Sequence, residues 1–227
     1  MSLMGARDTS SIDTPPLDRL PIATHVAQYS LELIKEVIIR EMNRGGQVFF
    51  VNNTIKGIEK IAKDIHDIIG EKARVAVAHG KMSPKALEEV MIKFIKNKID
   101  VLVSTTIIES GIDIPNANTL IVNHADKFGL ADLYQLRGRV GRFKRQAYAY
   151  FLTPKNFLLA KDARHRLSAI GRFTQLGAGF KIAMEDLKIR GAGNLLGAQQ
   201  HGYVMAVGFD LYCRLLRNVI TQKLLVD

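Results

Sequence analysis

Short apolar runs alternate with amphipathic segments along the first two thirds of the chain. The runs have the length of buried strands and lie at 47–52, 73–78, 100–104, 119–123 and 147–152. Segments with apolar residues at helical spacing lie at 25–42, 54–69, 83–97 and 130–139. Strands that alternate with helices form parallel sheets that are covered on both faces. The pattern therefore predicts a three-layer α/β domain with a mainly parallel sheet.

Polar residues and prolines mark the ends of the predicted elements. Thr24 is the expected N-cap of the first helix. Thr153 and Pro154 are a typical helix start, and the helix that they begin is expected to end near Arg172. Beyond it the chain is rich in glycine, and we expect loops there and a last helix over 211–224. The expected parts are a linker arm at 1–22, the α/β domain at 23–152 and a mainly helical segment at 153–227.

The composition is that of an ordinary globular protein. The chain has 227 residues, of which 47% are hydrophobic and 24% charged, and this excludes a disordered or fibrous chain. Its one cysteine, Cys213, excludes an internal disulfide and favours a reducing, cytoplasmic compartment. No apolar stretch approaches the roughly 20 residues that cross a bilayer, so we expect no membrane partner.

The positive charge is concentrated in one segment. The net charge is +10, from 32 Lys and Arg against 22 Asp and Glu. Residues 127–190 contain 14 basic and 4 acidic residues, so the rest of the chain carries 18 of each and is neutral. A localised basic segment is typical of a site for nucleic acid or for nucleotide phosphates. The alternatives are a solvated basic surface or a match for an acidic partner domain.

Polar side chains follow the predicted strands, where ligands bind in open parallel sheets. They are Asn52, Asn53, Thr54, His79, Gly80, Lys81, Thr105, Thr106, Asn123, His124 and Asp126. Several of them can donate hydrogen bonds to phosphate. Ordinary turn and cap chemistry explains some of these positions, but the full set favours an edge that faces a ligand.

Residues 135–142 (QLRGRVGR) are the strongest local signal. If they continue the predicted helix, Gln135, Arg139 and Arg142 share one face at spacings of four and seven, and two guanidiniums point the same way. Paired guanidiniums beside glycines suit the recognition of phosphate, and arginines at a γ-phosphate stabilise the charge of phosphoryl transfer. The alternative is a surface helix with paired arginines, but few acidic residues are near in the sequence.

A second signal is the segment 105–115 (TTIIESGIDIP), which follows a predicted strand. Gly111 gives room for a close approach of a ligand. Asp113 can accept a hydrogen bond from a ribose hydroxyl or from a bound water.

These residues resemble a known family. Segments 105–115 and 135–142 resemble motifs V and VI of superfamily 2 helicases, and 47–53 resembles motif IV, in the same order and strand context. Segment 186–197 (DLKIRGAGNLLG) is similar to the translocation motif that RecG-type helicases share with bacterial transcription-repair-coupling factors. The resemblance implies a RecA-like three-layer fold, followed by a mainly helical translocation motif.

The resemblance also implies roles for particular residues. Arg139 and Arg142 would reach the ATP phosphates, Gly111 and Asp113 would line the nucleotide, and Gln135 would couple that site to DNA. The residues expected to face the DNA backbone are Asn53, His79, Gly80, Thr105 and Thr106. The residues expected to couple closure of the motor lobes to a step along DNA are Arg166, Arg190 and Gln200.

Two parts of a complete ATP site have no counterpart in the sequence. The chain has no GxxxxGK[ST] loop to hold phosphates, and no acidic pair after an apolar strand to hold Mg²⁺. We therefore expect one wall of the site, with ATP and Mg²⁺ shared with a first RecA-like lobe that is absent from this chain, and no ATP hydrolysis by this chain alone. The start near Met1 suggests an excised fragment. The histidines show no ligand spacing, so no metal site is expected.

The resemblance implies the activity of a double-stranded DNA translocase that displaces stalled RNA polymerase and couples transcription to excision repair. RNA polymerase and the repair proteins would bind regions outside this chain. Two alternatives remain open: a lobe of a RecG-type branch-migration helicase, and a non-catalytic DNA-binding module.

Overall fold

The computed structural model describes residues 20–106, 116–141, 145–156, 158–175 and 177–190. The strands are β1 (Ala23–Gln28), β2 (Gln47–Val51), β3 (Val75–Ala78), β4 (Val101–Ser104), β5 (Ala117–Val122) and β6 (Tyr148–Thr153). The α-helices are α1 (Leu31–Asn43), α2 (Ile58–Ile69), α3 (Pro84–Ile95), α4 (Leu130–Arg137), α5 (Lys161–Arg172) and α6 (Gly179–Arg190). Two short 3-10 helices are η2 (Gly70–Lys72) and η4 (Ala125–Lys127).

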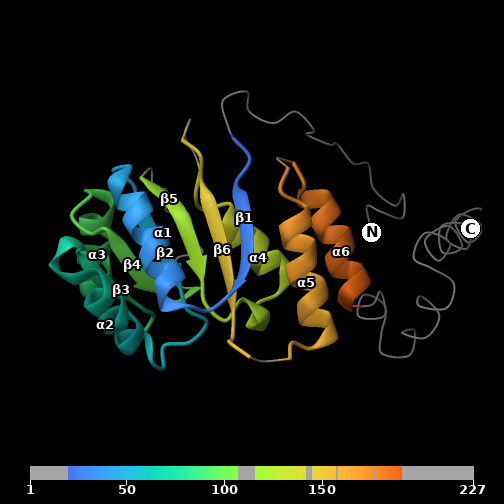
Figure 1. The fold of residues 1–227 in the computed structure, drawn as a ribbon, viewed down its shortest axis with the longest axis horizontal. Helices are drawn as coiled ribbons and strands as arrows, with labels where there is room; N and C mark the ends of the chain where they lie inside the picture. The colour runs from blue at the N-terminus through green and yellow to red at the C-terminus, as the bar shows by residue number, and fades with distance from the viewer. Residues whose placement is uncertain (1–19, 107–115, 142–144, 157, 176, 191–227) are drawn as a thin grey trace, which may run out of the picture.

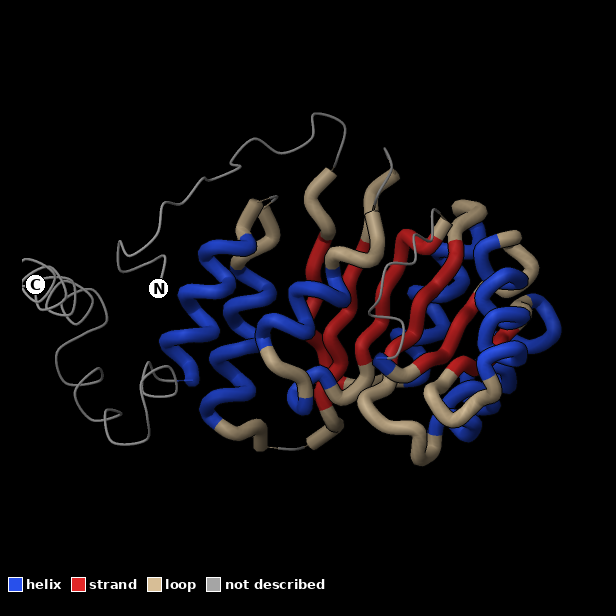
Figure 2. The backbone as a smooth tube through the Cα atoms, turned by 180° about the vertical axis from the view of Figure 1, so that it is seen from behind, coloured by secondary structure: helices blue, strands red, loops and turns tan. Residues whose placement is uncertain are grey.

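The strands form one parallel sheet in the order β1-β6-β5-β2-β4-β3. Helices α1 and α2 cover the face that is in front in Figure 1, and α3 and α4 cover the opposite face, which Figure 2 shows. Helices α5 and α6 lie beside β1 and pack on the same face as α4. This confirms the predicted α/β sandwich.

The central strand β2 shows why four of its five residues are apolar. Phe49 and Val51 point into the core beneath α3 and α4, and Val48 and Phe50 point into the core beneath α1 and α2. All four side chains are at most 2% exposed. A strand that is buried on both faces favours apolar side chains. The one polar residue of β2, Gln47, is buried, and its Nε2 donates to the Phe94 and Ile99 carbonyls.

The predicted first helix over 25–42 is wrong in its first part. Residues 23–28 are the edge strand β1, with His25 paired to Tyr150 of β6, and α1 begins only at Leu31. The N-cap is Ser30, whose hydroxyl accepts a hydrogen bond from the Leu33 amide at 3.3 Å. The hydroxyl of Thr24, the predicted cap, donates instead to the Ile22 carbonyl at 3.0 Å.

The helix predicted to begin at Thr153 and Pro154 also begins later. Thr153 is the last residue of β6, and α5 starts at Lys161 but ends at Arg172 as predicted. Helix α6 occupies residues for which the glycines suggested loops, and it packs against α4 and α5. Ile182 of α6 is buried in that core, and its burial outweighs the poor helix propensity of the nearby glycines.

Ile22, which the sequence placed in the arm, is 5% exposed and joins the same core cluster. The boundaries predicted at residues 22 and 152 stay predictions. Within the described residues, every helix is too short or too polar to span a bilayer.

Candidate functional site

The predicted DNA-facing residues lie together at the carboxyl-terminal edge of the sheet, the lower edge in Figure 1. Ser104 of β4 is in register with Val51 of β2 on one side and with Ala78 of β3 on the other. The chain therefore leaves all three strands at one level, with neighbouring strands about 4.8 Å apart. The residues that follow are the predicted set of Asn53, His79, Gly80, Thr105 and Thr106.

Exposure differs within this set. Gly80 is exposed, Asn53, His79 and Thr106 are half-buried, and Thr105 is 6% exposed. The backbone amide of Thr105 donates to the Ala78 carbonyl at 3.3 Å and so ties the end of β4 to that of β3. The Nδ1 atom of His79 is buried and has no hydrogen-bond partner among the described residues. This edge is thus available to a ligand mainly through the polar side chains of Asn53, His79 and Thr106.

Two buried asparagines form the floor of this edge. Asn123 Nδ2 donates to Asn52 Oδ1 at 3.0 Å, and Asn52 Nδ2 donates to the Thr54 carbonyl at 2.8 Å. These bonds join the loops after β2 and β5. Asn52 and Asn123 therefore shape the edge that positions Asn53.

The arginine-rich segment lies at the opposite, amino-terminal edge of the sheet. Gly141 has a φ of +74°, and a Cβ placed on it would lie 2.7 Å from Ala147 Cβ and 3.3 Å from Ile22 Cγ1. Ala147 and Ile22 immediately precede β6 and β1. Arg139 is only two residues from Gly141, so the predicted nucleotide side and the predicted DNA edge are separated by the length of the strands.

The predicted helix over 130–139 ends two residues early, so helical spacing does not place Arg139 relative to Gln135, and the expected face with Arg142 stays a prediction. Helix α4 ends at Arg137, and the chain then turns more tightly, with the Arg139 amide donating to the Leu136 carbonyl at 3.0 Å. Glycine at 138 and at 141 permits this path, so helical spacing no longer applies. Arg139 is half-buried and Gln135 exposed, and Arg142 lies outside the described residues.

The apolar side of the same segment is as predicted. Leu133, Leu136 and Val140 are at most 3% exposed and belong to the core. On its outer side, Gln135 and Gly138 line a pocket of about 280 Å³ with Thr174 and Gln175 from the turn before α6.

Arg137 is an important residue that sequence reasoning missed. It is 4% exposed, its Nη1 donates to the Ile170 carbonyl at 3.0 Å, and its guanidinium lies 5.1 Å from the ring centre of Tyr134. Burial lowers the pKa of this guanidinium, and the nearby Tyr134 opposes that shift. Arg137 thus joins α4 to α5. Nothing in the sequence distinguishes this structural arginine from Arg139, which is two residues further along.

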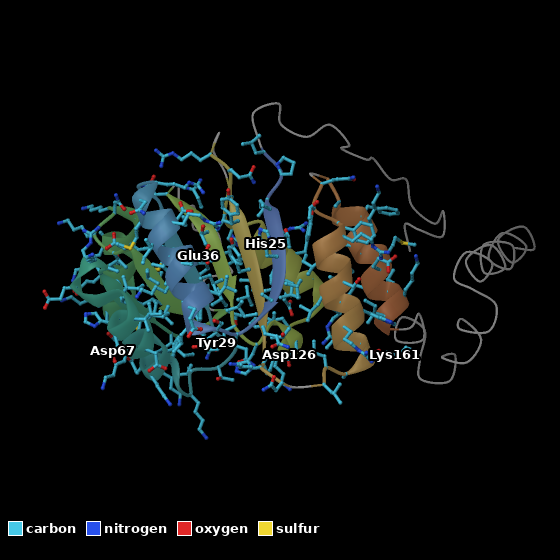
Figure 3. The ribbon with its side chains drawn as sticks, viewed as in Figure 1. His25, Tyr29, Glu36, Asp67, Asp126 and Lys161 are labelled. Atoms are coloured by element: carbon cyan, nitrogen blue, oxygen red, sulfur yellow. The ribbon has the colours of Figure 1, made fainter. Side chains whose placement is uncertain are left out.

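Arg166 of α5 reaches the carboxyl-terminal edge. Its Nη2 donates to the Asp126 carbonyl in η4 at 2.9 Å, and Figure 3 shows Asp126 at the lower end of the sheet. The Asp126 side chain is 5% exposed and lies 3.8 Å from Lys127 Nζ. Arg166 therefore connects α5 with the turn that follows β5.

Several predicted residues lie outside the described part of the chain. They are Gly111, Asp113, Arg142, Gln200 and the side chain of Arg190. Within the described ranges, no three His, Cys, Asp or Glu residues are grouped as metal ligands would be.

Comparisons with known proteins agree with this arrangement. The helicase conserved C-terminal domain family matches residues 29–144. The chain is 56% identical over 223 residues to the transcription-repair-coupling factor of Bacillus subtilis (strain 168), covering 98% of this chain and 19% of that protein. It is 53% identical, with the same coverage, to that of Staphylococcus aureus (strain USA300). It thus spans about a fifth of the length of these relatives, at 19%.

A solved structure is also similar. RecG bound to a three-way DNA junction superposes with a TM-score of 0.67 at 34% sequence identity, covering 89% of this chain and 26% of that one. This similarity extends beyond the matched family segment.

Proposed function

Because the chain belongs to the helicase conserved C-terminal domain family, we propose that it is the second motor lobe of an ATP-dependent translocase on double-stranded DNA. The parallel sheet with helices on both faces is the RecA-like fold of that family. The observation that most supports the proposal is the separation of Arg139, near the amino-terminal edge of the sheet, from Asn53 and Thr105 at the carboxyl-terminal edge. A motor needs its nucleotide site and its DNA track to be separate but joined by a rigid body.

At the amino-terminal edge, Arg139 and Arg142 would contact ATP phosphates, with Gln135 beside them and Gly111 and Asp113 along the nucleotide. Guanidinium and amide donors fit phosphate oxygens and not a metal ion. When bound, Mg²⁺–ATP supplies the phosphoryl group, and this chain's arginines would stabilise the charge that develops on it.

At the carboxyl-terminal edge, the small donors of the set Asn53, His79, Gly80, Thr105 and Thr106 would bind the DNA backbone. Contacts to phosphate carry no sequence information, as a translocase that moves along any sequence requires. Arg166, Arg190 and Gln200 would couple lobe closure to a step. The contact of Arg166 with the turn after β5 supports this role, because it joins the helical segment to the sheet.

The specific biological role is inferred from the relatives. Similarity to transcription-repair-coupling factors supports displacement of stalled RNA polymerase and coupling to excision repair in the cytoplasm, through regions outside this chain. The similarity to RecG on a three-way junction supports the alternative of a branch-migration helicase. Displacement of a stalled polymerase by the intact protein, compared with unwinding of a branched junction, decides between them.

Two substitutions test the motor assignment in the intact protein. Arg139→Ala and Arg142→Ala should each lower DNA-stimulated ATP turnover by 10³-fold or more, an order of magnitude typical of arginine fingers, and leave DNA affinity nearly unchanged. Turnover is measured by phosphate release and affinity by fluorescence anisotropy. Arg74→Ala, at the far side of the sheet, is the control. Lost DNA binding with normal turnover would contradict the proposal and favour a non-catalytic binding module.

A further inference from the structure

Arg44, the residue after α1, holds the chain that leads from the arginine-rich segment into β6. Its Nη2 donates to the Gln146 carbonyl at 2.6 Å, and Arg145 Nη1 donates back to the Arg44 carbonyl at 3.0 Å. The Arg44 guanidinium also lies 5.3 Å from the ring centre of Tyr148, the first residue of β6. These reciprocal contacts join positions about 100 residues apart in the sequence.

Arg44 also forms an ion pair with a buried carboxylate of α1, that of Glu41. Its Nη1 lies 3.5 Å from Glu41 Oε2, and the Glu41 side chain is 1% exposed. Thr119 of β5 donates its hydroxyl to the same Glu41 oxygen at 2.6 Å. Helix α1, through Glu41, and strand β5, through Thr119, therefore fix the direction of the Arg44 side chain independently of the loop that Arg44 binds.

The other side of the same loop is anchored as well. The backbone of Gly141 lies directly against Ala147 and Ile22. Gln146 Nε2 donates to the Pro21 carbonyl at 2.8 Å, and the Ala23 amide donates to the Ala147 carbonyl at 2.9 Å. Both described ends of the loop between α4 and β6 are thus attached to the body of the lobe.

We propose that Arg44 is a positioning residue for ATP hydrolysis, which holds residues 145–147 at the amino-terminal edge of the sheet and, through the contact of Ala147 with Gly141, the backbone next to Arg139. The proposal rests on the proposed function, in which Arg139 contacts the nucleotide. Arg44 does not touch the nucleotide: its donors are directed at Gln146 and Glu41. It acts by removing freedom from a segment whose alignment decides how well charge is stabilised, and a misplacement of about 1 Å in such a group can reduce rate about 10²-fold.

The test uses the intact motor protein with Arg44→Ala, Arg44→Lys, Arg139→Ala and the control Arg74→Ala. Arg74 is a matched control because its Nη2 also donates to a backbone carbonyl, that of Asn97 at 2.9 Å, and it also pairs with a carboxylate, Asp100, at 2.7 Å. It differs in lying beside β3, at the opposite end of the strand order. DNA-stimulated kcat, the KM for ATP, DNA affinity and Tm are measured for each variant.

We expect Arg44→Ala to lower kcat about 10- to 100-fold with the KM for ATP and the DNA affinity within twofold of wild type. Arg44→Lys should recover part of kcat, because an ammonium keeps the charge but cannot span both partners as a fork does. Arg74→Ala should lower Tm about as much as Arg44→Ala does, but its kcat should stay at the wild-type value.

Two results would overturn the positioning role. One is wild-type kcat in Arg44→Ala while Arg139→Ala is inactive. The other is an equal fall of kcat in Arg44→Ala and Arg74→Ala that follows Tm. An active Arg139→Ala would instead refute the proposed function, so the two failures can be told apart.

Discussion

At the residue scale, the packing around Glu41 shows how one glycine permits a buried polar group. A Cβ on Gly46 would lie 1.8 Å from Glu41 Oε1 and 2.8 Å from its Cδ. The carboxylate occupies the place that a side chain would take, and from there it receives the Thr119 hydroxyl. Gly46 is needed for space and not for an unusual backbone angle.

Gly46→Ala should therefore lower the free energy of unfolding by about 2–4 kcal/mol, because the methyl group displaces a buried, hydrogen-bonded carboxylate. Urea denaturation of the purified chain measures the change. Gly171→Ala is the control: the nearest atom to its added Cβ is at 3.8 Å, and helix propensity predicts a neutral or slightly stabilising effect. An unchanged midpoint for Gly46→Ala would show that Glu41 moves without loss.

At the element scale, the strands β3 and β4 are joined at their starts by one ion pair. Asp100 accepts hydrogen bonds from the Arg74 backbone amide at 2.7 Å, from its Nε at 2.9 Å and from its Nη2 at 2.7 Å. Burial opposes ionisation of Asp100, but the hydrogen bonds from Arg74 outweigh it, so the pKa of this carboxyl lies below its ordinary value. This pair joins the starts of the two strands at the β3 edge of the sheet, where Val75, Ala76 and Val77 are only half-buried.

Asp100→Asn should lower the free energy of unfolding by about 1–2 kcal/mol at neutral pH. Since the folded pKa lies below the unfolded value of about 3.9, the stabilisation is fully present above that pH and is lost as pH falls through the folded pKa. The difference between wild type and variant should therefore shrink below about pH 4. Urea denaturation across pH 3 to 7 measures it, and a constant difference would contradict the assignment.

At the scale of the whole molecule, sequence reasoning succeeded where burial is complete. Strands β2, β4 and β5 carry mainly apolar runs because both of their faces are covered, and polar residues within them, such as Gln47 and Thr119, are buried and hydrogen-bonded. The edge strand β1 does not follow from the sequence pattern, because polar residues such as His25 interrupt its apolar residues and both His25 and Val26 are exposed. Its parallel pairing with β6 supplies the stabilisation that local propensity does not.

The residues of the candidate site are a prediction from motif order, and the structure adds where the described ones lie. Motif order singles out Asn53, Thr105 and Arg139. The direction of the strands then places Asn53 and Thr105 at the carboxyl-terminal edge and Arg139 near the amino-terminal edge. The turn after Arg137 could not be foreseen from helical spacing, because it depends on Gly141 packing against Ala147. Arg44 belongs to no recognised motif, and its proposed positioning role is suggested only by its contact with Gln146.

The chain by itself should hydrolyse no ATP, with or without DNA, because its sequence has no GxxxxGK[ST] loop to hold the phosphates. Phosphate release from the purified 227 residues measures this, with the intact protein as the positive control. DNA-stimulated turnover by the chain alone would refute the assignment to a half-site.

The position of β1 has a consequence for how the protein is made. Among the described strands it emerges first from the ribosome, yet its one neighbour in the sheet, β6, is translated last. The four strands between them can assemble while β1 waits unpaired, and the longest chain closure of the sheet comes at the end. During synthesis, the nascent polypeptide therefore carries an open strand edge until residues near Thr153 leave the exit tunnel, and it is in this interval that we expect chaperones to bind it.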